Sequence, residues 1–260
     1  MFERAMGHFY KHFVIMRKSP SELAWIFVYP FIGILSIGLL ATYFISIGAP
    51  LDMVIFVLVG TVTWNFYDIS QRAVTYGITF DIWGGCLKHG IASPSRARDF
   101  IMGNGIFGYL SAMVAMILVG ILGLAVLNFN IFAGGFYLLL SLTTIFIFAT
   151  AMGLMIDYLV ITKGHNYVSL IWSSTGIVMI FSGVYYPITI LPEVVQTFAM
   201  VLPTTHALSG LRAYLGITAG DPLLSIVMAS GLSIFYFIIS VGMYKMALRK
   251  GRESGIVTWY

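Results

Sequence analysis

The segment that decides the fold lies near the C-terminal end of the chain. Residues 181–212 read FSGVYYPITILPEVVQTFAMVLPTTHALSGLR. A strongly apolar run stops at Pro187, and the next one begins after Asp221. The residues between them are too polar and too rich in proline to span a bilayer, yet they are too apolar for an ordinary solvated loop. The pattern predicts a segment that is partly embedded on one side of a membrane protein.

The composition around this segment is that of an integral membrane protein. The chain has 260 residues, of which 59% are hydrophobic and 9% are charged, and its mean hydropathy is +0.94. Because soluble domains carry about 25% charged residues, a soluble fold is excluded. Barrel strands alternate in polarity and run for only about ten residues. The long uninterrupted apolar runs therefore predict an all-α integral membrane protein.

Six transmembrane helices are predicted, since each needs about 20 mainly apolar residues. They cover residues 24–47, 53–71, 101–127, 131–156, 167–186 and 222–246. All of them belong to one transmembrane domain of residues 1–260. Three further segments complete this domain: an interfacial helix at 1–20, a cytoplasmic loop at 72–100 and an external re-entrant segment at 187–220.

The distribution of basic residues gives the orientation. Segments on one side of the predicted membrane hold thirteen of the fourteen Lys and Arg residues, and the other side holds only Arg212. By the positive-inside rule, both termini are cytoplasmic and the 187–220 segment is external. The net charge of +4 is therefore a signal of topology in the cytoplasmic membrane, and we expect no nucleic-acid partner.

The first twenty residues predict an amphipathic helix at the inner membrane surface. Apolar side chains fall on one arc of the helix and polar ones on the other. The apolar arc holds Phe2, Met6, Phe9, Phe13 and Met16, and the polar side holds Arg4, His8, Lys11 and Lys18. His8 and His12 are four residues apart, as metal ligands can be, but no further ligands complete a site. We therefore expect polar residues on the solvent side and no metal.

Two nucleotide-binding motifs are excluded. Gly103, Gly105 and Gly108 match a dinucleotide fingerprint by letter, but they open a membrane span and no acidic residue follows at the required distance. Small residues that let helices approach closely are the better interpretation. The phosphate-binding motif Gly-x-x-x-x-Gly-Lys-Ser/Thr does not occur in the sequence. We expect no cofactor in this chain, and any ATP that drives transport must bind another polypeptide.

The polar residues inside the spans are few. Asn65, Asp68 and Asp157 lie toward inner ends, from which they can reach the interface. An ion-coupled secondary carrier would place a carboxylate near the bilayer midplane, so that alternative is disfavoured. The other alternative is a membrane-embedded transferase. Its external candidates are Glu193, Thr204, Thr205, His206 and Arg212, but capping of proline-broken helices explains these residues more simply.

The order of these elements resembles a type-2 ABC exporter permease. The most specific similarity is Phe181-Ser-Gly-Val-Tyr-Tyr-Pro187, followed by Leu191-Pro192-Glu193, Leu202-Pro203-Thr-Thr-His206 and Leu211-Arg212. A second similarity is residues 85–94, GCLKHGIASP, which look like a Gly-Thr-Leu-Glu-x-Leu-Leu-x-x-Pro loop. Cys86, Lys88 and Gly90 depart from this loop pattern.

The resemblance implies a half-transporter. Two permease subunits, usually identical, work with two copies of an ABC ATPase that holds ATP and Mg²⁺. The interfacial helix and the 72–98 loop would contact this ATPase. The coupling residues would be Phe80, Trp83, Leu87, Lys88 and Pro94.

The resemblance also implies an external gate and a translocation path. The external segment would fold into two short helices, at about 189–201 and 204–216, as a re-entrant hairpin. The gate residues would be Gly183, Tyr185, Pro187, Pro192, Pro203, His206 and Arg212. The first, second and fifth spans would line the path, with Trp64, Tyr67, Trp172 and Tyr185 as aromatic contacts. Substrates in this family include drugs, lipids and lipid-linked saccharides, and the sequence does not choose among them.

Overall fold

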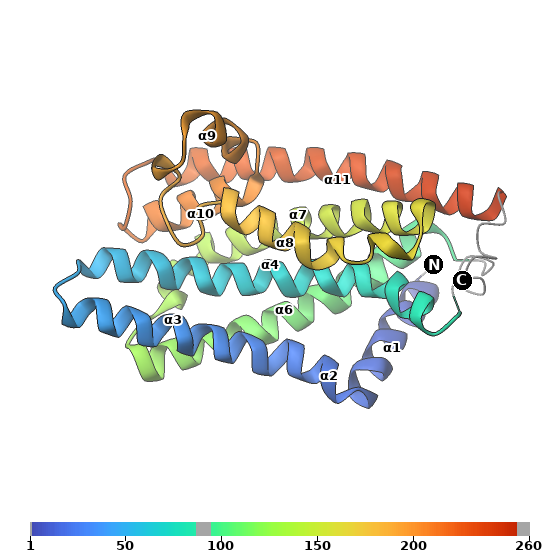
Figure 1. Cartoon of the computed structure of the whole chain (residues 1–260), viewed down its shortest axis with the longest axis horizontal. Coiled ribbons are helices and arrows are strands. Elements are labelled where there is room, and N and C mark those ends of the chain that lie inside the picture. Colours follow the sequence, from blue (N-terminus) through green and yellow to red (C-terminus); the bar gives the residue numbers. More distant parts are fainter. Residues whose placement is uncertain (1, 87–94, 254–260) are drawn as a thin grey trace.

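Among residues 2–86 and 95–253, which the computed structural model describes, five helices are long and apolar enough to cross a membrane. No β-strand occurs in these residues. The five candidate spans are Pro20–Ser46, Leu51–Trp83, Ala97–Leu127, Ile131–Lys163 and Pro222–Gly251. They lie side by side along the long axis of the molecule (Figure 1). Many large apolar side chains on the first and last of these spans are exposed, which is the surface expected of a multi-pass membrane protein.

The first span begins at a proline and contains an irregular turn. Helix α1 (Phe2–Lys18) is followed by α2 (Pro20–Leu23), the π-helical η1 (Ala24–Val28) and α3 (Tyr29–Ser46). Pro20 occupies a first-turn position, where its missing N–H costs little. Pro30 lacks the N–H that would bond to Ile26, four residues earlier, and the wider π turn lies just before it.

Helix α4 (Leu51–Trp83) is much longer than the predicted second span at 53–71. Residues 72–83 were expected in the cytoplasmic loop, but they continue the helix. The expectation was wrong because the buried threonines in this stretch are satisfied by carbonyls of the helix itself. Thr75 and Thr79 donate to carbonyls four residues back, at 2.9 and 3.0 Å, and both are buried.

Three other long helices agree with the predicted spans and extend beyond them. They are α6 (Ala97–Leu127), α7 (Gly135–Lys163), which follows the short η2 (Ile131–Gly134), and α11 (Pro222–Glu253). Side-chain caps fix two of the starts. Asn130 Oδ1 accepts from the Phe132 N–H at 3.1 Å, and Asp221 Oδ1 accepts from the Leu223 N–H at 2.8 Å.

The predicted fifth span at 167–186 contains only a short helix. Helix α8 (Leu170–Phe181) follows η3 (His165–Tyr167) and has 12 residues. It is therefore about 18 Å long, against a hydrocarbon core of about 30 Å. The chain turns away at Gly183, whose φ of 64° is a left-handed value that glycine adopts without strain.

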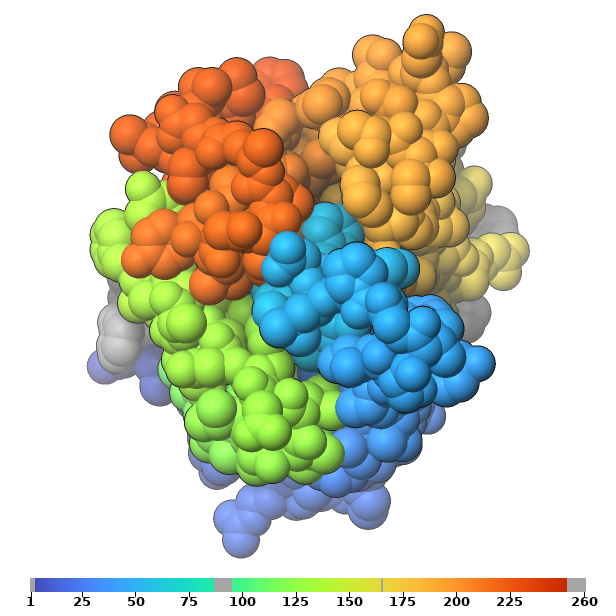
Figure 2. Space-filling view, turned by 90° about the vertical axis from the view of Figure 1, so that its left-hand side faces the viewer, coloured from blue at the N-terminus to red at the C-terminus, as the bar shows by residue number. Residues whose placement is uncertain are grey.

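The segment between α8 and α11 forms two short helices, close to the positions expected for them. They are α9 (Glu193–Met200) and α10 (Pro203–Tyr214), and the single turn η4 (Ile188–Ile190) precedes them. Pro187 and Pro192 stand at the N-caps of η4 and α9, and Pro203 begins α10. The prolines therefore set the breaks, as the sequence predicts. Figure 2 looks onto this end of the molecule, where the gold residues around α9 stand at one edge.

Helix α7 is central in the bundle and contacts α4, α10 and α11. One cluster of buried side chains joins it to α4 and α6, with Tyr67, Leu142 and Phe148 among its members. A second cluster lies toward the C-terminal end of α11 and includes Val74, Leu154, Ile171 and Tyr244. Helix α1 and the end of α11 lie at the same end of the molecule, and α9 and α10 lie at the other (Figure 1). We call the end with α1 the terminal end, and the end with α9 and α10 the hairpin end.

Candidate functional site

Arg212 organises the hairpin end. Its side chain is only 3% exposed, and it donates to the main-chain carbonyls of three residues. Nη1 donates to Gly183 O at 2.8 Å, and Nη2 donates to Val184 O at 2.6 Å and to Phe56 O at 3.0 Å. The guanidinium also lies over the Phe56 ring, with Cζ 3.3 Å from the ring centroid. One buried cation therefore joins α10, α4 and the end of α8.

The position of Arg212 explains how the chain can break after α8. Where a helix ends inside the protein, the carbonyls of the following turn have no helical partner, and burying them unpaired is costly. Gly183 and Val184 lie just beyond Ser182, the C-cap of α8, and Arg212 satisfies the carbonyls of both. Non-helical backbone at membrane depth is tolerated only where protein satisfies it in this way. No acidic partner of Arg212 is present among the described residues, so main-chain carbonyls and the Phe56 ring face its charge.

Helix α4 approaches this site closely because it carries glycine there. A methyl group added to Gly60 would overlap the Val184 carbonyl oxygen, and it would come within 2.8 Å of Arg212 Nη2. Any larger residue would push α4 away from the turn that follows α8. Gly60 was absent from the predicted gate residues, and no local motif in the sequence distinguishes it.

The other predicted gate residues lie around the same turn. Ser182 and Thr204 hydroxyls hydrogen-bond to each other, which ties α8 to α10. His206 Nε2 donates to Met200 O at 2.8 Å and so caps the end of α9. Pro203 is buried, Tyr185 is partly buried, and Pro187 and Pro192 are exposed. His206, Thr204 and Arg212 thus all hold helix ends together, which favours the capping interpretation over a transferase site.

Apart from Tyr185, which lies at the turn after α8, the predicted path residues Trp64, Tyr67 and Trp172 have different surroundings. Tyr67 is fully buried and stacks on Trp64, with ring centroids 4.9 Å apart. It also packs against Phe148 of α7, so it lies within the core of the subunit. Trp64 is partly exposed, and Trp172 on α8 is 41% exposed. Of the three side chains, Trp172 is therefore the most accessible to a substrate in this conformation.

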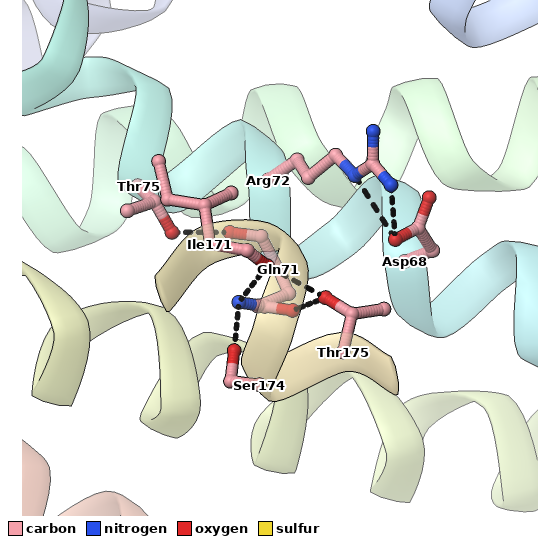
Figure 3. Close-up of polar contacts among 7 residues, drawn as sticks. All are labelled: Asp68, Gln71, Arg72, Thr75, Ile171, Ser174 and Thr175. Atoms are coloured by element: carbon pink, nitrogen blue, oxygen red, sulfur yellow. Dashed lines mark hydrogen bonds and ion pairs between the residues drawn. The ribbon is translucent and has the colours of Figure 1, made fainter. Parts of the chain in front are cut away.

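A buried polar network joins α4 to α8, as Figure 3 shows. Gln71 is fully buried. Its Nε2 donates to Ser174 Oγ at 3.2 Å, and its Oε1 accepts from Thr175 Oγ1 at 2.6 Å. The next residue, Arg72, binds Asp68, which lies one turn earlier in α4, through Nε at 2.9 Å and Nη2 at 2.8 Å. Gln71 was not among the predicted site residues, because only the fold shows that it faces α8.

The terminal end contains an ion pair between α1 and α4. Lys11 Nζ lies 2.7 Å from Asp81 Oδ1 and donates to Gly77 O at 3.1 Å. Phe80 and Trp83, two predicted coupling residues, lie beside Asp81, and their rings pack on each other. Trp83 is 51% exposed, so it is available to a partner. The other predicted coupling residues, Leu87, Lys88 and Pro94, lie outside the described residues.

Helix α1 is oriented differently from the prediction. Its histidines were expected on the solvent side, yet His12 is 3% exposed and stacks on Phe107 of α6, with ring centroids 5.0 Å apart. Burial, together with the nearby Lys11, lowers the pKa of His12 to about 3, so the ring is neutral. His8 Nε2 hydrogen-bonds to Ser95 Oγ at 3.2 Å. The apolar Met6 and Phe13 are exposed instead.

Close packing of α1 on α6 accounts for this orientation. A methyl group on Gly103 would overlap the Ala5 carbonyl oxygen of α1. One on Gly108 would lie 3.0 Å from the Ala73 side chain of α4. The interpretation of these glycines as helix-packing residues is therefore confirmed.

Asp157 on α7 is also placed differently from the expectation that it reaches the interface. It is fully buried, and neither carboxylate oxygen has a hydrogen-bond partner. Asp68 and Asn65 do have partners, since Asp68 pairs with Arg72 and Asn65 Nδ2 donates to Thr61 O at 2.9 Å. Asp157 is therefore the polar side chain that the bundle satisfies least well among these three.

The comparison with protein families identifies the class of the chain. The family model for ABC-2 type transporter matches residues 4–215, which is most of the sequence and includes both ends of the bundle. No curated protein matches the chain.

Proposed function

The chain belongs to the ABC-2 type transporter family, and we propose that this transmembrane permease exports an amphiphilic substrate with energy from a separate ATPase subunit. The substrate is a drug, a lipid or a lipid-linked saccharide. The ATPase is present in two copies and holds ATP and Mg²⁺. A second permease, identical to the first, completes the transporter in the cell membrane.

The observation that carries this proposal is the continuity of α4. This helix has 33 residues and is therefore about 50 Å long. At one end it holds the Lys11 ion pair and the exposed Trp83. Near the other end its Phe56 and Gly60 contact the Arg212 site. A push on Trp83 would therefore move the turn after α8 without any intervening hinge.

The orientation that we propose places the terminal end in the cytoplasm. The basic residues support it, because Arg212 is the one Lys or Arg in the segments assigned to the outside. In this orientation α8, together with the residues that flank it, is the fifth of six spans. Helices α9 and α10 form the external re-entrant hairpin. Hydrogen bonds from Arg212 to main-chain carbonyls stabilise the non-helical turn that leads into it.

The export mechanism that we propose follows from these contacts. Closure of the ATPases on α1 and the end of α4 tilts α4. The Gln71 network transmits the tilt to α8 in each subunit. Substrate then passes between the subunits along α3, α4 and α8, where Trp172 is exposed. The turn around Gly183 opens as the external gate.

Substitution of Trp83 tests this mechanism. Trp83→Ala should leave ATP hydrolysis by the purified complex within about twofold of wild type, but should lower export at least about tenfold, which is a loss of about 1.4 kcal/mol in coupling. Hydrolysis is measured on the complex, and export is measured by mass spectrometry of the compounds that cells release. Phe235→Ala, which removes an exposed aromatic ring from α11, a helix outside the proposed path, is the control. If both variants export normally, Trp83 is not a coupling residue.

A further inference from the structure

Two neighbouring residues of α4 reach the two other helices of the proposed path. Gln71 binds Ser174 and Thr175 of α8. Arg72 reaches the start of the first span instead, where its guanidinium lies over the Trp25 ring, with Cζ 4.3 Å from the ring centroid. Figure 3 shows the Gln71 and Arg72 side chains leaving α4 in different directions. This part of α4 therefore contacts both the first span and α8.

Arg72 is held in place for its contact with the first span. Asp68, one turn earlier in α4, accepts hydrogen bonds from Nε and Nη2 of Arg72. A guanidinium that binds a carboxylate in its own plane can still offer its flat face to an aromatic ring. The side chains of Arg72 and Asp68 are only 14% and 19% exposed. Because a cation–π contact is stronger where water is excluded, this one is favourably placed.

The first span presents more than one group to this cation. The Trp25 ring stacks on Tyr29, with ring centroids 4.0 Å apart and 10° between the ring planes. Glu22, about one turn before Trp25, lies close enough to Arg72 for their opposite charges to interact. An aromatic face and a carboxylate from the first span therefore meet one arginine of α4. We call the contact of Arg72 and Asp68 with Trp25 the arginine clamp.

The arginine clamp lies before an irregular part of the first span. Trp25 belongs to the π-helical η1, and Pro30 follows without an N–H for the bond to Ile26. The helix η1 contacts α6, whereas the extensive contacts of the first span with α4 belong to α3. Helices bend most readily at prolines and π turns. A contact before this interruption is therefore needed if the start of the first span is to follow α4.

We propose that Arg72 is a positioning residue of the exporter, which makes the start of the first span move together with α4. When the ATPases tilt α4, Gln71 carries α8 and the arginine clamp carries the first span, so that the walls of the path shift as one unit. Without the clamp, the start of the first span would bend at the π turn and remain against α6. This inference rests on the proposed function and deepens it.

Spin-label distances in the purified full chain test the arginine clamp without ATP. Nitroxides are attached to cysteines at Val28 in η1 and Trp83 in α4, which are 49% and 51% exposed. Cys86→Ser first removes the only native thiol. Electron paramagnetic resonance should give a narrow distance distribution. Adding Trp25→Leu should make this distribution at least about twofold broader, because the start of the first span is then released from α4.

Export by the complex with its ATPase tests the role of the clamp in transport. Trp25→Leu leaves the Asp68–Arg72 pair intact, so no buried charge loses its partner. This variant should export at least about tenfold more slowly, with ATP hydrolysis within about twofold of wild type. Trp25→Phe keeps an aromatic face under Arg72 and should export within about threefold of wild type. Phe27→Leu is the matched control, since Phe27 belongs to the same π turn but is 39% exposed and lies outside the clamp.

Three results would overturn the inference. They are an unchanged distance distribution in Trp25→Leu, wild-type export by this variant, and ATP hydrolysis that falls in parallel with its export. The last result would mean that the ring only supports the fold. A wild-type complex that does not couple ATP hydrolysis to export would instead contradict the proposed function, whereas the spin-label distances decide whether the clamp holds the first span.

Discussion

At the scale of single residues, Arg212 is the side chain on which the hairpin end depends most. Its three bonds to main-chain carbonyls all come from one buried charged group. Arg212→Gln should destabilise the protein by about 3 kcal/mol, because it leaves buried carbonyls without donors. Thermal unfolding of the purified protein in detergent measures the effect.

Arg212→Lys serves as the comparison, since it keeps the charge but cannot reach three carbonyls in a fork geometry. It should lie between wild type and Arg212→Gln. If Arg212→Gln instead melts with wild-type stability while activity disappears, the arginine acts on a substrate and the transferase alternative gains support.

Asp157 gives a second prediction at this scale. A buried carboxylate without partners is costly, and its neutral isostere removes that cost. Asp157→Asn should therefore leave the melting temperature unchanged or raise it, with export retained. A stable Asp157→Asn protein that no longer transports would contradict the ATP-driven mechanism, because a titratable group would then be required, as in an ion-coupled carrier.

Residues whose contacts are local could be predicted from the sequence, whereas residues whose partners are distant in the chain could not. The 181–212 motif identifies Arg212 and the prolines that break the helices, because proline acts on the backbone locally. It does not identify Gly60, Gln71 or Lys11, whose partners are 124, 104 and 70 residues away. A contact between distant segments leaves no local pattern, so only the fold reveals it.

At the scale of elements, the mechanism that we propose requires α1 to be docked on the bundle, so that closure of the ATPases moves α4. Gly103→Ala should separate α1 from α6, since the added methyl group overlaps the Ala5 carbonyl. We expect a loss of about 1–3 kcal/mol from this overpacking. Accessibility of α1 to a protease is the measurement, and Gly103→Ala should be cut faster than wild type.

The matched control for this experiment is Gly7→Ala on α1, because nothing lies within 4 Å of a methyl group at that position. Alanine at an exposed helical position is favoured over glycine by about 0.5–1 kcal/mol, so this variant should be cut no faster than wild type. Equal cleavage of both variants would show that α1 does not dock through Gly103.

Helix lengths were the least accurate part of the sequence prediction. The second span was ended at residue 71 because Asp68, Gln71 and Arg72 are polar. The helix continues to Trp83, since Asp68 and Arg72 pair with each other and Gln71 binds α8. Conversely, α8 ends earlier than its apolar sequence indicates, because Ser182 and Gly183 turn toward α10. Hydropathy indicates which segments are buried, but it does not indicate which neighbouring residue hydrogen-bonds to a buried polar group.

At the scale of the whole molecule, the bundle carries two groups of candidate functional residues at opposite ends, joined by α4. The family match covers both ends. Composition and long apolar runs were sufficient to predict an all-α membrane protein, because these properties depend on the solvent rather than on particular contacts. The arrangement of α1 against α4 and α6 required the structure, since two of its polar side chains, Lys11 and His12, contact the bundle.

The claim that this permease is powered by a separate ATPase is tested most directly by purifying the full chain from its native membranes in mild detergent. The measurement is ATP hydrolysis by the purified material together with its subunit composition. We predict that an ATPase subunit copurifies in an equal number of copies and that the complex hydrolyses ATP. Isolation of the chain alone, with transport intact and no ATP hydrolysis, would contradict the claim.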